Sequence, residues 1–123
     1  MRGCSEKGWE MTKSRRMVVL VTCGTLPEAR RIARSAVESR VAACVNIQLN
    51  PVESIYRWKN KVQVAREYLL VFKTAAARFP ELEKLVHRLH SYDVPECIVL
   101  PMVSGSAGYL RWIDESTKPS SRS

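Results

Sequence analysis

The stretch of strand-forming residues from 52 to 74 constrains the fold of this 123-residue chain more than any other feature. Residues 52–58 and 62–74 are rich in β-branched and aromatic side chains, and between them Lys59-Asn60-Lys61 reads as a turn in which Asn60 takes a left-handed conformation. The two segments therefore predict one long hairpin. Its arms are longer than a domain of this size needs, so part of the hairpin is expected to project and pair with another surface.

The rest of the folded chain reads as amphipathic helices between shorter strands. Thr25 and Glu28 match a capping box, which predicts a helix from Thr25 to about Arg40. A second helix is expected at 79–90 and stops before Pro95, because a proline forces the preceding residue into an extended conformation. Further strands are expected at 17–23 and 96–103, and a short last helix at 109–116. Residues 41–47 are expected to lead through a bend or bulge at Asn50-Pro51 into the first arm of the hairpin, so that the two segments count as the second strand.

This order of elements, β-α-β-β-α-β followed by a C-terminal helix, is the ferredoxin-like α+β arrangement. It predicts a sandwich of helices on one antiparallel sheet, with a single folded domain over residues 17–117. The residues at helical spacing predict the buried face of the first helix: Ala29, Ile32, Ala33, Ala36 and Val37.

Much of the formal charge of +8 lies at the two ends of the chain. Residues 1–16 carry +3 and residues 118–123 carry +2, so the middle, 17–117, carries only +3. The ends are therefore interpreted as flexible, solvated tails, and a basic arm for nucleic acid is the alternative. No segment approaches the 18 apolar residues of a membrane span, and the apolar run at 17–21 is too short for a signal peptide, so a cytoplasmic protein is expected.

The four cysteines, Cys4, Cys23, Cys44 and Cys97, form no C-x-x-C pair. The sequence thus offers no zinc ribbon or redox motif, and without a secretion signal a disulfide framework is not expected. Three of them lie within or beside apolar runs, where cysteine behaves as a small buried hydrophobe. A soft metal ligand is the alternative.

Several short strings, taken together and in register, resemble the CutA (divalent-cation tolerance) family. They are Arg-Val-Ala-Ala-Cys-Val-Asn-Ile at 40–47, Ser-Ile-Tyr-Arg-Trp at 54–58, Leu-Val-Phe-Lys-Thr at 70–74, Leu-His-Ser-Tyr-Asp-Val-Pro-Glu at 89–96 and Tyr-Leu-Arg-Trp-Ile at 109–113. The resemblance spans about 17–117. It implies a homotrimer packed through sheets and hairpins, an architecture similar to the PII signalling proteins, and an association with tolerance of divalent metals, copper above all.

The chain departs from the family pattern at three places. Ser91 follows the histidine where the family commonly has proline, and Lys59-Asn60-Lys61 stands where Glu-Gly-Lys is usual. Some members carry a cysteine at the position of Val21, two residues before Cys23. A metal role therefore transfers only weakly to Cys23.

Residues 90–96 hold the richest set of functional side chains. His90, Asp93 and Glu96 place an imidazole and two carboxylates within seven residues, a combination that suits Cu(II) or another divalent cation. Such a metal is not expected to be required for folding. The alternative is structural: His90 ends the helix, where the dipole favours it, and Glu96 pairs with Lys73.

A binding cleft for a metal or small ligand is expected around this segment, completed by neighbouring subunits. Its other walls are expected to be Tyr56, Trp58, Lys73 and Tyr92.

Other functions find less support in the residues. The G-x-S-x-G, P-loop and H-E-x-x-H motifs are absent, so an enzyme is not expected. An acylphosphatase-like enzyme needs a glycine-rich loop, and residues 23–27 offer one glycine and a proline. The RNA-binding signature of this fold is also absent, so nucleic acid is not an expected partner. A PII-like adaptor that binds a partner protein stays open as an alternative.

Overall fold

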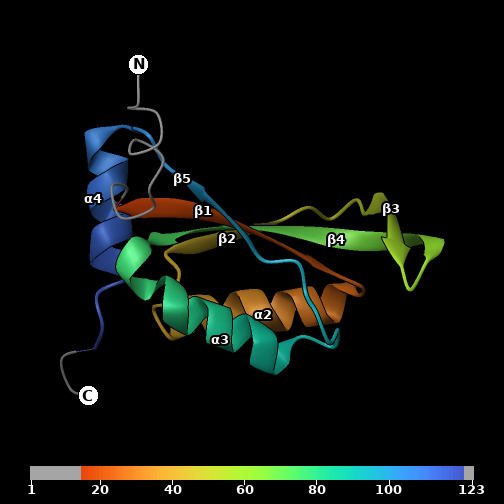
Figure 1. The fold of residues 1–123 in the computed structure, drawn as a ribbon. Helices are drawn as coiled ribbons and strands as arrows, with labels where there is room; N and C mark the ends of the chain where they lie inside the picture. The colour runs from red at the N-terminus through yellow and green to blue at the C-terminus, as the bar shows by residue number, and fades with distance from the viewer. Residues whose placement is uncertain (1–14, 121–123) are drawn as a thin grey trace.

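The computed structural model describes residues 15–120, which form a mixed α/β fold with one antiparallel sheet (Figure 1). Its elements are β1 (Arg16–Cys23), α2 (Leu26–Glu38), β2 (Cys44–Ile47), β3 (Val52–Trp58), β4 (Lys61–Ala75), a 3-10 turn η2 (Ala76–Arg78), α3 (Phe79–Leu89), β5 (Ile98–Pro101) and α4 (Ala107–Ser116). The predicted antiparallel sheet and three helices are confirmed, but the predicted second strand is divided into β2 and β3, because residues 48–51, which include Pro51, are not part of a strand.

Strand β4 is the axis of the sheet. Its inner half pairs with β1 on one side and β2 on the other, which gives the order β2-β4-β1-β5. Its outer half pairs only with β3, from Val52 opposite Glu67 to Trp58 opposite Lys61. This long hairpin extends beyond the ends of α2 and α3 (Figure 1), as the sequence predicts.

The core lies between the sheet and the helices α2 and α3, which cover one of its faces (Figure 1). Alternate residues of β1 point into it, as expected for a half-covered strand. The large side chains that are fully buried include Val19, Ile32, Leu70, Phe72 and Leu82. Val37, predicted to be buried on α2, is 41% exposed, because it lies in an open groove between α2 and Val45 and Ile47 of β2.

The ends of several elements differ from the prediction. Helix α2 stops at Glu38, and Arg40 turns the chain with a φ of 66°. The next strand therefore begins at Cys44 instead of residue 41, although residues 41–43 are buried. In the hairpin, Lys59 joins Asn60 in the left-handed region, with φ values of 52° and 67°, which fits the tight turn of a two-residue hairpin.

Strand β5 covers only 98–101 of the predicted 96–103. The predicted tails lie largely outside the described residues, but Arg16, assigned to the N-terminal tail, begins β1. No helix among residues 15–120 is long and apolar enough to span a membrane.

Helix α4 is fastened to the start of β1 by an ion pair. The Arg16 guanidinium donates from Nε and Nη2 to the two carboxylate oxygens of Asp114, at 3.0 and 2.6 Å. This hydrogen bond lowers the pKa of Asp114 below its ordinary value. Ile113, beside Asp114, is fully buried, so the pair and this apolar contact together hold α4.

The pair predicts a pH-dependent contribution to stability. Asp114→Asn should lower the free energy of unfolding at pH 7 by about 1 kcal/mol or less, because the pair is partly exposed. Since the folded state holds the pKa of Asp114 low, the stabilisation is present above the unfolded pKa and is lost as the pH falls. Urea unfolding at pH 7 and under acid conditions measures both effects.

A matched control for this prediction is Glu115→Gln, which removes an ion pair with Lys118 in which both side chains are about two-thirds exposed. This variant should leave stability unchanged at every pH. An equal loss in the two variants would show that the Arg16–Asp114 pair has no special role.

Candidate functional site

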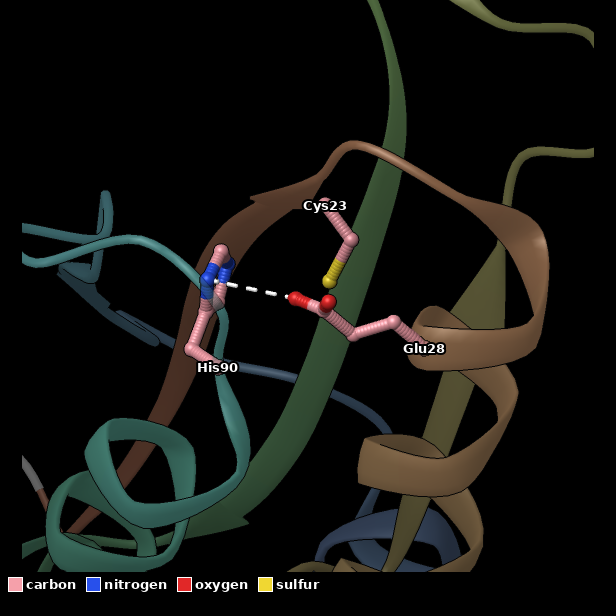
Figure 2. Close-up of side chains that lie close together, drawn as sticks. All are labelled: Cys23, Glu28 and His90. Atoms are coloured by element: carbon pink, nitrogen blue, oxygen red, sulfur yellow. Dashed lines mark ion pairs between the residues drawn. The ribbon is translucent and has the colours of Figure 1, made fainter.

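Three ligand-bearing side chains meet where β1 ends. Cys23 is the last residue of β1, Glu28 lies in the first turn of α2, and His90 follows the last turn of α3. Figure 2 shows the three side chains pointing toward one another. A sulfur, a carboxylate oxygen and a ring nitrogen all lie within 4.8 Å of one another, and all three residues are buried. We call Cys23, Glu28 and His90 the buried cluster.

Hydrogen bonds fix the orientation of the His90 ring. Nε2 lies 2.7 Å from the carbonyl oxygen of Thr22, which can only accept, so Nε2 carries a proton and donates it. Nδ1 receives the backbone N–H of Tyr92 at 3.1 Å and lies 3.3 Å from Oε2 of Glu28. Nδ1 is therefore the ring nitrogen that faces the Glu28 carboxylate.

Glu28 is oriented from the other side. Its Oε2 accepts the backbone N–H of Ser91 at 3.1 Å. Its backbone N–H donates to the hydroxyl of Thr25 at 3.3 Å, so the threonine caps the helix as predicted. The carboxylate does not close the other half of the capping box but reaches the chain after α3. Glu28, which faces Cys23, therefore links α2 to the chain that follows α3.

The His90 and Glu28 side chains come together within the buried cluster. Nδ1 and the Glu28 Oε2 lie 3.3 Å apart, and each of these two atoms also accepts a backbone N–H, from Tyr92 and from Ser91. The negative charge of the carboxylate makes this a place that favours a cation. Burial raises the pKa of the Cys23 thiol to about 12, and the negative charges of Glu28 and Glu67 add to the effect. Without a cation, the sulfur is thus held as a neutral thiol.

Tyr92 separates the buried cluster from a surface cleft. Its ring packs against His90 with centroids 4.7 Å apart, and its hydroxyl donates to Glu67 at 2.8 Å. Gly24 makes room for it, since a Cβ at this position would lie 3.1 Å from the Tyr92 oxygen. On its other side Tyr92 lines a cleft of about 580 Å³ beside the hairpin.

The predicted site residues divide between these two places. His90 and Cys23 lie in the buried cluster, whereas Asp93 and Glu96 line the cleft with Tyr56, Trp58 and Tyr92. Hence the predicted trio of His90, Asp93 and Glu96 is not brought together around one point. Glu96 instead approaches the Thr22 hydroxyl, at 3.5 Å.

Lys73 lies away from this cleft. It is six residues along β4 from Glu67, roughly 20 Å, and its ammonium donates to Asn46 on β2. The structure therefore also separates Lys73 from Glu96, the partner considered for it in the structural alternative.

Sequence reasoning missed Glu28 and Glu67. The capping box gives Glu28 a local explanation, yet Glu28 lies four residues before Ile32 on the apolar stripe of α2, where a charge is unusual. That position was a usable signal. Glu67 gave no such signal, because its burial depends on Tyr92, which is 25 residues away in sequence.

Comparison with known proteins identifies relatives over most of the chain. Residues 17–116 match the family model described as CutA1 divalent ion tolerance protein. A divalent-cation tolerance protein CutA from Thermus thermophilus is 46% identical over 100 residues, covering 81% of this chain and 96% of the relative. A mouse protein CutA is 41% identical and covers 84% of this chain, which spans only 58% of the mouse protein.

Solved structures agree with the sequence matches. The structure of the divalent cation tolerance protein (Cut A1) from T. thermophilus gives a TM-score of 0.81 at 45% identity, over 84% of this chain and 99% of that one. CutA1 from Oryza sativa gives 0.82 at 40% identity, over 87% and 97%. The family description and the names of the T. thermophilus protein refer to tolerance of divalent ions.

Proposed function

The chain belongs to the CutA1 divalent ion tolerance family, and on this premise we propose that it binds a divalent cation at the buried cluster as part of a response to metal ions. The observation that carries the proposal is the approach of one sulfur, one oxygen and one nitrogen to within 4.8 Å of one another. The proposal replaces Asp93 and Glu96 by Glu28 as the carboxylate ligand.

The donor set indicates which cations fit. A thiolate is a soft ligand, imidazole is borderline and carboxylate is hard, so the mixture suits zinc or copper better than magnesium or calcium. Thr22 and Ser91 supply hydrogen bonds that hold His90 and Glu28 in place, as outer partners do in metal sites. Three protein ligands leave a further coordination position for another donor.

We propose the cytoplasm as the location, as expected from the sequence. A reducing compartment keeps Cys23 as a thiol that a metal can bind. Relatives carry other locations in their names, chloroplastic in Arabidopsis thaliana and periplasmic in Archaeoglobus fulgidus, so location varies within the family.

The same family membership leads us to propose a ferredoxin-like subunit that assembles as a trimer. The face of the sheet away from α2 and α3 is apolar and partly open: Ile98 and Leu100 on β5 are nearly half exposed. On the hairpin, Ile55, Val62 and Val64 are each more than 60% exposed. Apolar area of this extent favours burial against further copies of the chain.

The metal proposal is tested by titrating the full-length protein with Co²⁺, a probe that does not oxidise thiols. Cys23→Ala and Glu28→Gln should each weaken binding at least about tenfold, because each removes one of three ligands. The ultraviolet band of a sulfur–cobalt bond should appear in the wild type and be absent in Cys23→Ala. Thermal melting without metal checks that the variants are folded.

The matched control is the double variant Asp93→Asn with Glu96→Gln, which removes two carboxylates from the neighbouring cleft. It should bind Co²⁺ as the wild type does. If this variant loses binding and Glu28→Gln keeps it, the metal site lies in the cleft and the buried cluster is not the site.

The assembly is tested by light scattering after size-exclusion chromatography. Three chains of 14.0 kDa give about 42 kDa for the wild type. Ile98→Lys with Leu100→Lys should shift the mass toward that of one chain, since charges would be buried in the interface. Val37→Lys, exposed on α2, should not. A wild-type monomer would refute the trimer.

A further inference from the structure

The cleft beside Tyr92 carries a charge opposite to that of the whole chain, whose formal net charge is +8. No lysine, arginine or histidine is among the described residues that line it. Its volume of about 580 Å³ is in the range of small-molecule sites. Three carboxylates and three aromatic rings dominate its walls: Glu67, Asp93, Glu96, Tyr56, Trp58 and Tyr92.

Glu67 is a buried carboxylate without a cationic partner. It is 7% exposed, and among the described residues the side chain that donates a hydrogen bond to it is the neutral hydroxyl of Tyr92. Between residues 15 and 120, no basic side chain lies within ion-pair distance of it. Burying a carboxylate is costly unless opposite charge compensates it, so this wall of the cleft favours a cation.

The aromatic residues add a second attraction for positive charge. Ser54, Tyr56 and Trp58 alternate along β3, and the register with β4 puts them on the same face of the hairpin as Glu67. Tyr56 and Trp58 are both close to half exposed. The faces of such rings carry negative potential and attract ammonium groups, most strongly when water is partly excluded.

Two basic residues of the hairpin, Arg57 and Arg66, lie on its other face. Arg57 is opposite Val62 and Arg66 is opposite Glu53, out of phase with Glu67 in the alternation of both strands. Lys61, opposite Trp58 beside the turn, shares the face of Glu67, but it lies six residues from Glu67, roughly 20 Å along β4, and is not part of the cleft wall. The residues that line the cleft are thus acidic and aromatic, and anionic ligands are repelled from it.

A bare metal ion fits this cleft poorly. The one group of three clustered Cys, His, Asp or Glu ligand atoms among the described residues is the buried cluster, so the carboxylates of the cleft do not converge on one point. Aromatic walls offer a metal no ligand atoms but suit an apolar body.

We propose that the cleft binds an organic ammonium ion, a protonated or quaternary amine whose charge faces Glu67 and whose carbon groups contact Tyr56, Trp58 and Tyr92. All of these residues come from a single chain. The site is separate from the buried cluster and does not depend on metal binding there.

The test compares choline with 3,3-dimethylbutan-1-ol, a neutral molecule of nearly the same shape. Both are titrated into the full-length protein at constant ionic strength, and binding is followed by calorimetry and by the indole N–H signal of Trp58 in NMR spectra. Choline should bind and shift that signal, and the neutral alcohol should bind at least about tenfold more weakly.

Variants locate the binding. Glu67→Gln, which keeps the shape of the side chain, and Trp58→Leu should each weaken choline binding roughly tenfold. Glu96→Gln, at an exposed position, gives a second charge test that does not disturb the core. Glu53→Gln, on the opposite face of the hairpin, and Trp112→Leu on α4 should change nothing. Cys23→Ala should also bind choline normally, which separates this result from the metal proposal.

Two results would overturn the inference. One is equal affinity for choline and the neutral alcohol, or no binding of choline at all. The other is unchanged choline binding in Glu67→Gln and Glu96→Gln, since charge in the cleft would then have no role.

Discussion

The pairing of β4 with β1 is the constraint on which the rest of the structure depends. Eight residue pairs, from Arg16 opposite Ala75 to Cys23 opposite Tyr68, hold the two strands together and place both against the helices. Beyond the end of β1, β4 pairs with β3 instead, starting at Glu67. That change of partner creates the corner in which the buried cluster and the cleft lie on either side of Tyr92.

Two buried carboxylates at this corner have different surroundings, and the difference separates their roles. Glu28 faces an imidazole nitrogen and a thiol, which together make a set of metal ligands. Glu67 faces a phenol and open, aromatic-lined space, which offers no further metal ligand but suits a large cation. Proximity to a negative charge alone would not distinguish a metal from an ammonium ion; the neighbouring atoms do.

Much of the fold follows from local patterns in the sequence, and much of the site does not. The Thr25 cap, the amphipathic stripe of α2 and the turn at Asn60 depend on neighbouring residues, and all three were predicted. The buried cluster joins residues up to 67 positions apart, so no local pattern could show that His90 faces Glu28 instead of Asp93 and Glu96. Within one chain Lys73 does not line the cleft, and spacing along a strand could not show this because it does not reveal where the cleft begins. The one available signal was Glu28 on an apolar helix stripe, and the capping box concealed it by offering a sufficient local explanation.

The central claim, that Cys23, Glu28 and His90 together hold a metal, is tested most directly by X-ray absorption spectroscopy. The sample is the zinc-loaded protein with Cys4→Ser, Cys44→Ser and Cys97→Ala, in which Cys23 is the remaining cysteine. The account predicts one sulfur at about 2.3 Å together with nitrogen and oxygen ligands at about 2.0–2.2 Å, one of them an imidazole. A spectrum with only nitrogen and oxygen neighbours would contradict it, because the metal would then be bound somewhere other than the buried cluster.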